Sequence, residues 1–398
     1  MRTINFMNEQ VASSETARDI NRSIVLNLIR TNQPISRADL ARATKLQRST
    51  ISLIVEQLMR ERWVVEAAVG QLPRGRKPRL LRLNTDRAAI IGINVMPGVT
   101  TVALADLNAN FREQVSIPTI ADADEFIQSL SARVRTLIRA NPNLVYEGIG
   151  VSLPGRVDYI SQKLAFAPNL GWKLVDLKTP LERATRLPVQ IENAANACAL
   201  AQVWSGPHEG TQNLVAVTVS EGIGTGIIAN GHLVRGERGA AGEFGHVSWN
   251  GGGPTCGCGS RGCWETYASN LAAIRNYNCG ISRNRPRRNR AQAHASVSSF
   301  DDLLVLAEGG DVTACEVLDR MAYYLGIGIA MLINGLAPSI ITVVGEVTRV
   351  WERVDPIIQR VVQERSRNDA GTRIVPLDSS TQPRLRGTVA LVLQKHFQ

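Results

Sequence analysis

The sequence of 398 residues is too long for one ordinary hydrophobic core and predicts two or three domains. Its 44% hydrophobic and 20% charged residues are typical of a globular protein. No apolar run reaches the about 18 residues that a membrane-spanning helix needs, and the N-terminal stretch lacks the apolar centre of a secretory signal. These features exclude a membrane partner and predict a cytoplasmic protein.

Positive charge is concentrated at the N-terminal end of the chain. The formal net charge is +10, and residues 1–85 contribute +8 of it, with 15 Lys and Arg against 7 Asp and Glu. A localised positive field fits a polyanionic partner, with nucleic acid as the first candidate. A solvated basic surface is the alternative that charge alone leaves open.

The same region has the pattern of three helices followed by two strands. Residues 18–32 carry aliphatic side chains at helical spacing, which predicts the first helix. Ser36 is placed to cap a second helix, with Asp39 three residues later as in a capping box. A third helix is expected from Arg48 after a short break. Two strand-like runs around a basic tip follow it, as in a wing.

Small polar and basic side chains cluster at the start of the third helix, which indicates a winged helix-turn-helix DNA-binding domain over residues 1–85. In such domains these side chains reach base edges in the major groove. The extended Arg-Gly-Arg stretch within residues 73–79 fits a narrow minor groove, or serves as a linker. A plain three-helix bundle is the alternative for the whole region. The candidate DNA contacts are Arg37, Gln47, Arg48, Ser49, Thr50, Ser52, Arg74, Arg76 and Lys77.

From about residue 86 the sequence alternates between strand and helix patterns. A strand–turn–strand unit followed by a helix and another strand occurs twice. We therefore expect a duplicated α/β unit with a cleft between its halves. The first lobe is predicted over residues 86–200 with a C-terminal helix at about 382–398, and the second lobe, with the surface for self-association, over residues 201–381.

Three of the six cysteines lie within eight residues and follow a histidine. His246, Cys256, Cys258 and Cys263 have the spacing H-x9-C-x-C-x4-C. Three thiolates and one imidazole suit tetrahedral Zn²⁺, and four protein ligands leave no open position, so we predict one structural zinc ion per chain. In a reducing cytosol a metal site is favoured over a disulfide framework. Three unligated thiols in a loop are the alternative.

Seven segments resemble, in the same order, the motifs of the ROK family of bacterial sugar kinases and sugar-responsive repressors. They are GIGVSLPGRVD, APNLGW, ENAANACALA, GIGTGIIANGHLVRG, GAAGEFGH, CGCGSRGCWE and LINGLAPSIITVVG. The match covers residues 86–398 and implies an actin/hexokinase-like two-lobed body, and the N-terminal region resembles the winged helix of the repressor branch. The resemblance implies the same zinc site and a sugar site made of Gly155, Arg156, Asn193, Glu243, His246 and Glu265, with Asn169 as a further candidate.

The catalytic base of the kinases has no counterpart in this sequence. The kinases have an Asn-Asp turn, and here the turn is Asn193-Ala194. A methyl group cannot accept the proton that a sugar hydroxyl loses in phosphoryl transfer. Glu192 is adjacent, but in an extended segment its side chain is expected to point the other way.

Three glycine-rich turns on the nucleotide side are also altered. The first reads NVMPG, Asn94 to Gly98, where the kinases have Asp-x-Gly-Gly-Thr, and Pro97 removes a backbone N–H group. Glu221 stands where the second turn usually has threonine, and Glu346 replaces a glycine in the third. A carboxylate would repel a phosphate. The residues of the family's sugar site are therefore present in this sequence, and the glycine-rich turns of its ATP site are not.

The sequence thus predicts a DNA-binding transcriptional regulator, a repressor, and no enzyme. Its expected partners are operator DNA, a sugar or sugar-derivative effector, and further copies of itself in a homodimer or homotetramer. An ATP-dependent sugar kinase that carries a DNA-binding domain is the second hypothesis. A regulator released from DNA by a transport protein is the third. The arginine-rich run Ile281 to Arg290 is interpreted as a mobile surface loop.

Overall fold

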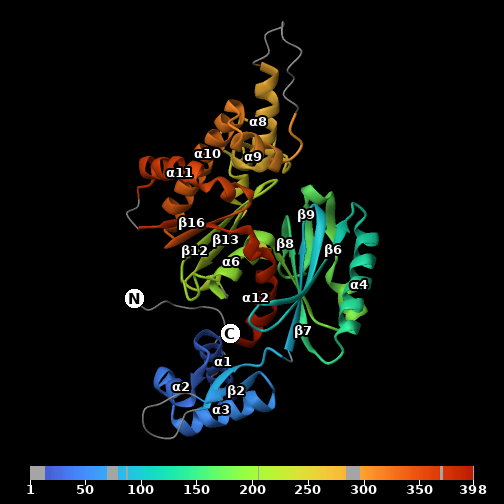
Figure 1. Cartoon of the computed structure of the whole chain (residues 1–398), viewed down its shortest axis with the longest axis vertical. Coiled ribbons are helices and arrows are strands. Elements are labelled where there is room, and N and C mark those ends of the chain that lie inside the picture. Colours follow the sequence, from blue (N-terminus) through green and yellow to red (C-terminus); the bar gives the residue numbers. More distant parts are fainter. Residues whose placement is uncertain are drawn as a thin grey trace.

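A computed structural model describes most of the chain as a small N-terminal domain below a two-lobed body (Figure 1). Arg74, Arg76 and Lys77, and most of the arginine-rich run, lie outside the described part. Among the described residues, no helix has the length and apolar character needed to cross a bilayer. The described residues are 14–69, 79–86, 88–204, 206–283, 296–367 and 371–397.

The N-terminal domain contains three helices and a three-stranded antiparallel sheet of order β1-β3-β2. The Ser36 side chain accepts a hydrogen bond from the Asp39 N–H, and the Asp39 side chain accepts one from the Ser36 N–H, so the expected capping box is confirmed. Strands β2 and β3 pair where the wing is predicted. The elements are α1 (Ser14–Asn32), β1 (Ile35–Ser36), α2 (Arg37–Thr44), α3 (Arg48–Arg60), β2 (Val64–Val69) and β3 (Arg79–Leu83).

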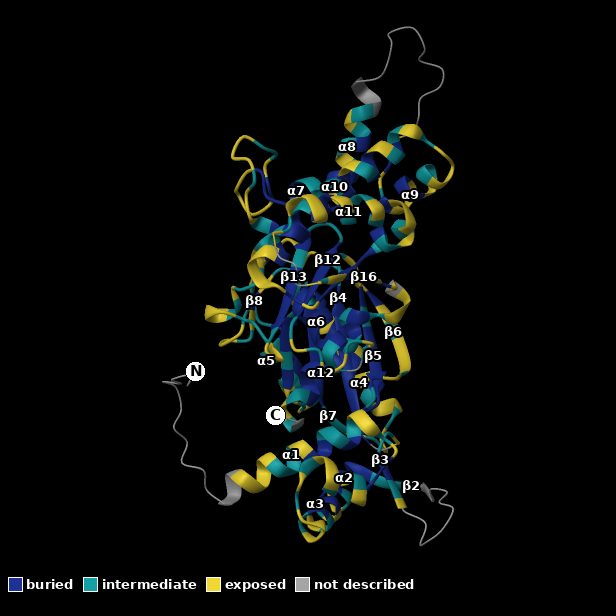
Figure 2. Ribbon diagram, turned by 90° about the vertical axis from the view of Figure 1, so that its left-hand side faces the viewer, coloured by how far each residue is buried: buried dark blue, intermediate teal, exposed yellow. Residues whose placement is uncertain are grey.

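The first lobe is built on a five-stranded sheet of order β11-β7-β4-β5-β6. Helices α4 and α5 and the C-terminal helix α12 cover this sheet, and every residue of β4 is buried (Figure 2). A separate three-stranded sheet, β10-β9-β8, lies between β7 and α5 in the chain. The elements are β4 (Ala88–Val95), β5 (Gly98–Ala105), β6 (Phe111–Thr119), α4 (Ala123–Ala140), β7 (Val145–Leu153), β8 (Arg156–Asp158), β9 (Lys163–Ala167), β10 (Trp172–Val175), α5 (Lys178–Thr185), β11 (Val189–Asn193) and α12 (Pro383–Phe397).

The second lobe repeats the first. Its sheet has the order β14-β13-β12-β15-β16, so each sheet is an antiparallel meander of three strands to which two parallel strands are added on the same side. The predicted duplication is therefore confirmed. The elements are α6 (Ala194–Trp204), β12 (Leu214–Val219), β13 (Ile223–Ala229), β14 (His232–Leu233), α7 (Glu265–Ala268), α8 (Asn270–Arg283), α9 (Phe300–Glu308), α10 (Val312–Leu336), β15 (Ile340–Val344), α11 (Trp351–Arg365) and β16 (Arg373–Leu377).

Helices α6 and α12 lie side by side between the two sheets (Figure 1). Their backbones approach closely because glycines stand at the contacts. A Cβ on Gly387 of α12 would lie 1.9 Å from the Ala197 carbonyl oxygen of α6, and one on Gly150 of β7 would lie 2.1 Å from the Thr388 oxygen. Gly387 therefore sets how closely α12 approaches α6, and Gly150 sets how closely β7 approaches α12.

Substitution Gly387→Ala is expected to lower the free energy of unfolding by about 1–3 kcal/mol, because the added methyl group overpacks the contact between α6 and α12. Thermal and urea unfolding would measure the loss. Gly335→Ala is the matched control, since Gly335 is also helical but a Cβ there has nothing within 4 Å. That change should be neutral or stabilising by up to about 1 kcal/mol. Equal effects of the two substitutions would contradict the close approach.

Candidate functional site

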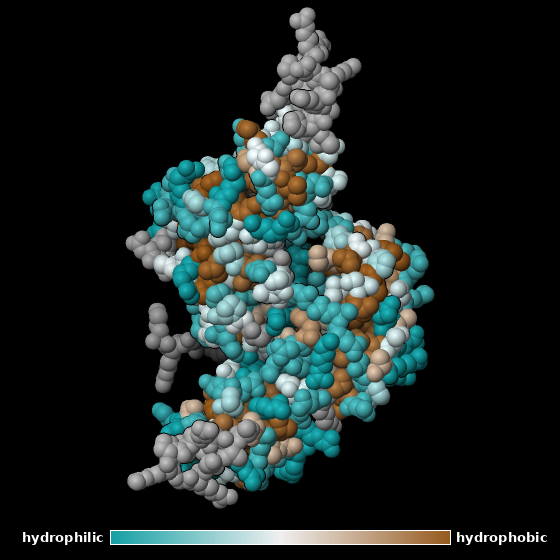
Figure 3. Space-filling model, viewed as in Figure 1, coloured by the Kyte–Doolittle hydropathy of each residue, from teal (hydrophilic) through white to brown (hydrophobic). Residues whose placement is uncertain are grey.

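A polar cavity of about 240 Å³ lies between the two lobes, in the hollow visible in Figure 3. It is lined by the carboxyl end of β11, the loop after β7, the β12–β13 turn and the segment after β14. All six candidate sugar residues line it, together with Asn169 and Ala194. The six are Gly155, Arg156, Asn193, Glu243, His246 and Glu265.

Asn193 joins strand β11 to helix α6. Its Oδ1 accepts hydrogen bonds from the N–H groups of Ala195 at 2.8 Å and Asn196 at 3.4 Å, which caps the helix, and its Nδ2 donates to the Gly155 carbonyl oxygen at 2.6 Å. Gly155 has φ +88°, and a Cβ there would lie 2.2 Å from the Phe166 carbonyl oxygen. One Nδ2 hydrogen of Asn193 is left for a ligand.

Glu192 is buried and does not line the cavity, as expected from its place in the strand. Its carboxylate accepts hydrogen bonds from the Asn193 N–H at 3.0 Å and from Asn196 Nδ2 at 2.9 Å. It also forms an ion pair with Arg235 of the second lobe, with Nε at 2.9 Å from Oε2. Ala194 occupies the first position of α6 and lines the cavity beside them. Glu192 therefore fixes the Asn193 turn and contacts the opposite lobe.

The altered glycine-rich turns border this cavity and a second one. Pro97 and Glu221 line it, and so does Arg384 at the start of α12. A second cavity of about 210 Å³ shares Arg384 with the first and is also lined by Glu346. Glu346 accepts a hydrogen bond from Asn270 Nδ2 at 2.9 Å. The carboxylates at the two altered positions thus both face space between the lobes.

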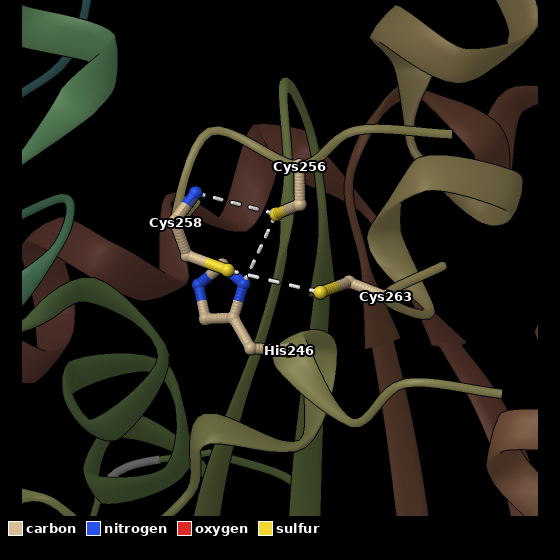
Figure 4. A group of neighbouring side chains, drawn as sticks. All are labelled: His246, Cys256, Cys258 and Cys263. Carbon is tan, nitrogen blue, oxygen red and sulfur yellow. Dashed lines mark hydrogen bonds between the residues drawn. The ribbon is translucent and has the colours of Figure 1, made fainter. Parts of the chain in front are cut away.

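His246 and three cysteines converge at one wall of the cavity (Figure 4). Their ligand atoms all lie within 4.8 Å of one another, with His246 Nδ1 3.5 Å from Cys256 Sγ and Cys258 Sγ 3.7 Å from Cys263 Sγ. Zinc bond lengths of about 2.0–2.3 Å in a tetrahedron separate the ligand atoms by about 3.5–3.8 Å. A disulfide would need about 2.05 Å between sulfurs. The four side chains therefore fit a tetrahedral metal.

The cysteine–histidine cluster and the cavity share side chains. His246 directs Nδ1 to the thiols, and its Nε2 lies 3.7 Å from Glu243 Oε2. Glu265 Oε1 lies 2.9 Å from Cys256 Sγ, and Glu265 also lines the cavity. Burial raises the pKa of Glu243, and the positive charge of Arg156 opposes that rise. The cluster thus holds two acidic side chains against the space between the lobes.

The candidate DNA contacts differ in exposure. Gln47, Arg48 and Ser49 are exposed at the start of α3, and Arg48 has no ion-pair partner in the described part of the chain. Thr50 and Ser52 are half-buried. Arg37 is half-buried, and its guanidinium lies 3.8 Å from Glu56 and 4.0 Å from Glu66. The start of α3 therefore presents free polar side chains, and Arg37 is held by its own neighbours.

Two copies of one α/β unit that enclose a polar cleft define the class of actin- and hexokinase-like proteins. Within this class the chain belongs to the ROK family, whose sequence model matches residues 90–395. It is 33% identical over 334 residues to the "Xylose repressor" of Bacillus subtilis strain 168, a match that covers 83% of each protein.

Two solved structures extend the comparison. A ROK family transcriptional regulator, a homologue of the Escherichia coli MLC protein, is 26% identical, with a TM-score of 0.83 over 96% of this chain and 98% of that one. A ROK family glucokinase from Streptomyces griseus, in complex with glucose and AMPPNP, is also 26% identical, with a TM-score of 0.67 over 77% of this chain and 99% of the kinase. The regulator thus matches almost the whole chain, and the kinase matches about three quarters of it.

Proposed function

We propose that the protein is a transcriptional repressor whose affinity for operator DNA is controlled by a sugar bound between its lobes. One observation carries the proposal: the cavity gathers six hydroxyl-binding candidates around Ala194, a residue that cannot act as a base. A site of this kind binds a sugar without activating it for phosphoryl transfer. A triphosphate is disfavoured at the altered glycine-rich turns, because Glu221 and Glu346 are negatively charged and Pro97 lacks an N–H group. The xylose repressor among the relatives makes aldoses the first effectors to test.

A structural zinc ion per chain is part of the proposal. His246, Cys256, Cys258 and Cys263 would hold it, with Nδ1 and three thiolates as ligand atoms. When bound, the metal supplies a cross-link and no reactive position, because four protein ligands complete its coordination. The protein's own Glu243 and Glu265 are then held rigidly, and each can accept two hydrogen bonds from neighbouring sugar hydroxyls.

The start of α3 is the surface that would contact the DNA bases. Side chains of Gln47, Arg48 and Ser49 suit base edges and phosphates. A homodimer would present two such surfaces, and both half-sites are read only when the surfaces lie about 34 Å apart or a multiple of that distance. A sugar that favours a different arrangement of the lobes would change this spacing and release the DNA.

The test measures operator binding by fluorescence anisotropy with and without a panel of aldoses and N-acetylhexosamines. The operator fragment is first selected from random DNA. We expect one sugar to raise the melting temperature and to weaken operator binding about tenfold or more. Glu243→Gln should abolish this response, because it removes a charged acceptor in the cavity, and should leave sugar-free operator binding unchanged. Glu316→Gln, an exposed position on α10, is the control.

Two outcomes would contradict the proposal. The first is a chain that no sugar of the panel stabilises. The second is ATP-dependent phosphorylation of a sugar that Glu243→Ala abolishes, which would establish the kinase hypothesis instead. A coupled ATP-turnover assay on the same samples measures it.

A further inference from the structure

Helix α6 begins in the cleft and ends at the N-terminal domain. Asn193 caps its start, and Ala194, Ala195 and Asn196 line the cavity. Its 11 residues span about 16 Å at a rise of about 1.5 Å per residue. The last of them is Trp204, which contacts Arg30 of α1. One short helix therefore touches both the sugar cavity and the domain expected to bind DNA.

Arg30 makes two contacts with the end of α6 and one with the segment that follows it. Its guanidinium donates a hydrogen bond to the Trp204 carbonyl oxygen, lies 4.2 Å from the centroid of the Trp204 ring, and forms an ion pair with Glu209. The arginine side chain is only 9% exposed. A cation is favoured there because the carbonyl end of a helix carries partial negative charge. Asn27 Oδ1 holds the same guanidinium from within α1.

Other contacts of the N-terminal domain go to the first lobe and α12. Gln33 Nε2 donates to Asn108 Oδ1 at 2.8 Å, and the Trp63 ring lies 4.6 Å from the ring of His396. One apolar cluster joins side chains of α1 and α3 to β4, β5 and α12, and Trp204 at the end of α6 also packs against it. The domain is thus packed on the first lobe through a continuous core.

Helices α6 and α12 pack mainly on different lobes. α12 contacts β4 and β7 of the first sheet, and α6 contacts β12 and β13 of the second. Glu209 lies in the segment between α6 and β12, so it also belongs to the second lobe. A change in the angle between the lobes would therefore move Trp204 and Glu209 relative to a domain that is fixed to the first lobe.

We propose that Arg30 is the coupling residue of this repressor: it joins the DNA-binding domain to the second lobe through the end of α6, and so transmits the ligand state of the cleft to the DNA-binding surface. This inference rests on the proposed function. It requires no new ligand, and it assigns Arg30 a role separate from both DNA contact and sugar contact.

The test is Arg30→Gln in the full chain, studied with the sugar and operator found for the wild type. Sugar affinity is expected to stay within twofold and sugar-free operator affinity within threefold. The ratio of operator affinities without and with sugar should fall from tenfold or more to below threefold. A role in stability alone would lower the melting temperature and leave this ratio intact.

Arg386→Gln is the matched control. Arg386 also donates to backbone carbonyl oxygens, those of Thr381 and Ala109, and lies 5.5 Å from the Phe111 ring, but none of these contacts reaches the N-terminal domain. This variant should keep the full ratio. Arg30→Lys keeps the charge near Glu209 but loses the planar stacking on Trp204, so its ratio of operator affinities should be intermediate. It also provides a second variant for the test if Arg30→Gln does not fold.

An unchanged ratio in folded Arg30→Gln or Arg30→Lys would overturn the coupling role. So would an equal loss of the ratio in Arg386→Gln. A wild-type protein in which no sugar changes operator affinity would instead count against the proposed function, so the two failures can be told apart.

Discussion

Substitution Cys258→Ser is expected to abolish zinc binding and sugar binding together. Serine is a poor zinc ligand, and three remaining ligands cannot complete the closed tetrahedral site. Cys258 is the exposed member of the cluster, so its loss disturbs packing less than loss of the buried Cys256 or Cys263. Zinc content measured by mass spectrometry should fall from one per chain to well below one.

The effect on sugar affinity follows from the shared side chains. Without the metal, the segment that carries His246 is no longer cross-linked to the cysteine loop, and Glu243 and Glu265 lose their fixed positions. Hydrogen bonds to charged groups contribute about 1.5–3 kcal/mol each. Loss of one such bond from Glu243 and one from Glu265 would therefore weaken sugar binding at least about a hundredfold. Isothermal titration calorimetry measures this change, and operator binding without sugar should be retained.

Cys279→Ser is the control for the zinc prediction. Cys279 is an exposed free cysteine on α8 and does not belong to the cluster, so this variant should keep its zinc and its sugar affinity. Full zinc content in Cys258→Ser would refute the four-ligand assignment. Normal sugar affinity in a zinc-free variant would refute the link between the cluster and the cavity.

The elements that local sequence determines were predicted well. The capping box of Ser36 and Asp39 uses contacts three residues apart, and the structure has it where expected. The hairpin of β4 and β5 was expected from two β-rich runs around Pro97 and Gly98, and the structure has the turn there. Helix α1 begins at Ser14, four residues before its predicted start. Residues 14–17 (SETA) have no large apolar side chain, so apolar periodicity could not reveal this first turn.

The candidate site was predicted from motifs, and the six residues do line one cavity. What the sequence did not reveal depends on tertiary contacts. Glu192 was interpreted only as pointing away from the cleft, and its ion pair with Arg235 joins residues 43 positions apart. Arg30 and Trp204 are 174 positions apart. No periodicity or spacing rule relates such pairs, so only the fold brings them together.

Arg48→Ala should produce the largest loss of operator binding among the changes in α3. Arg48 is the first residue of the helix, is exposed and has no ion-pair partner among the described residues, so its guanidinium is available to DNA without a competing cost. A bidentate contact of arginine with guanine contributes about 1–3 kcal/mol. A dimer that loses two such contacts would bind its operator at least about thirtyfold more weakly.

Anisotropy titrations over a range of salt concentrations distinguish the two roles that Arg48 could have. A base contact should relax the sequence preference at one operator position, because the side chain that distinguishes the bases is gone. A phosphate contact should weaken binding to all sequences alike and reduce the salt slope by about 1 per lost contact. Arg139→Ala, which removes an exposed charge from α4, should change neither quantity. Operator affinity of Arg48→Ala within twofold of the wild type would show that the start of α3 is not the surface that contacts the DNA bases.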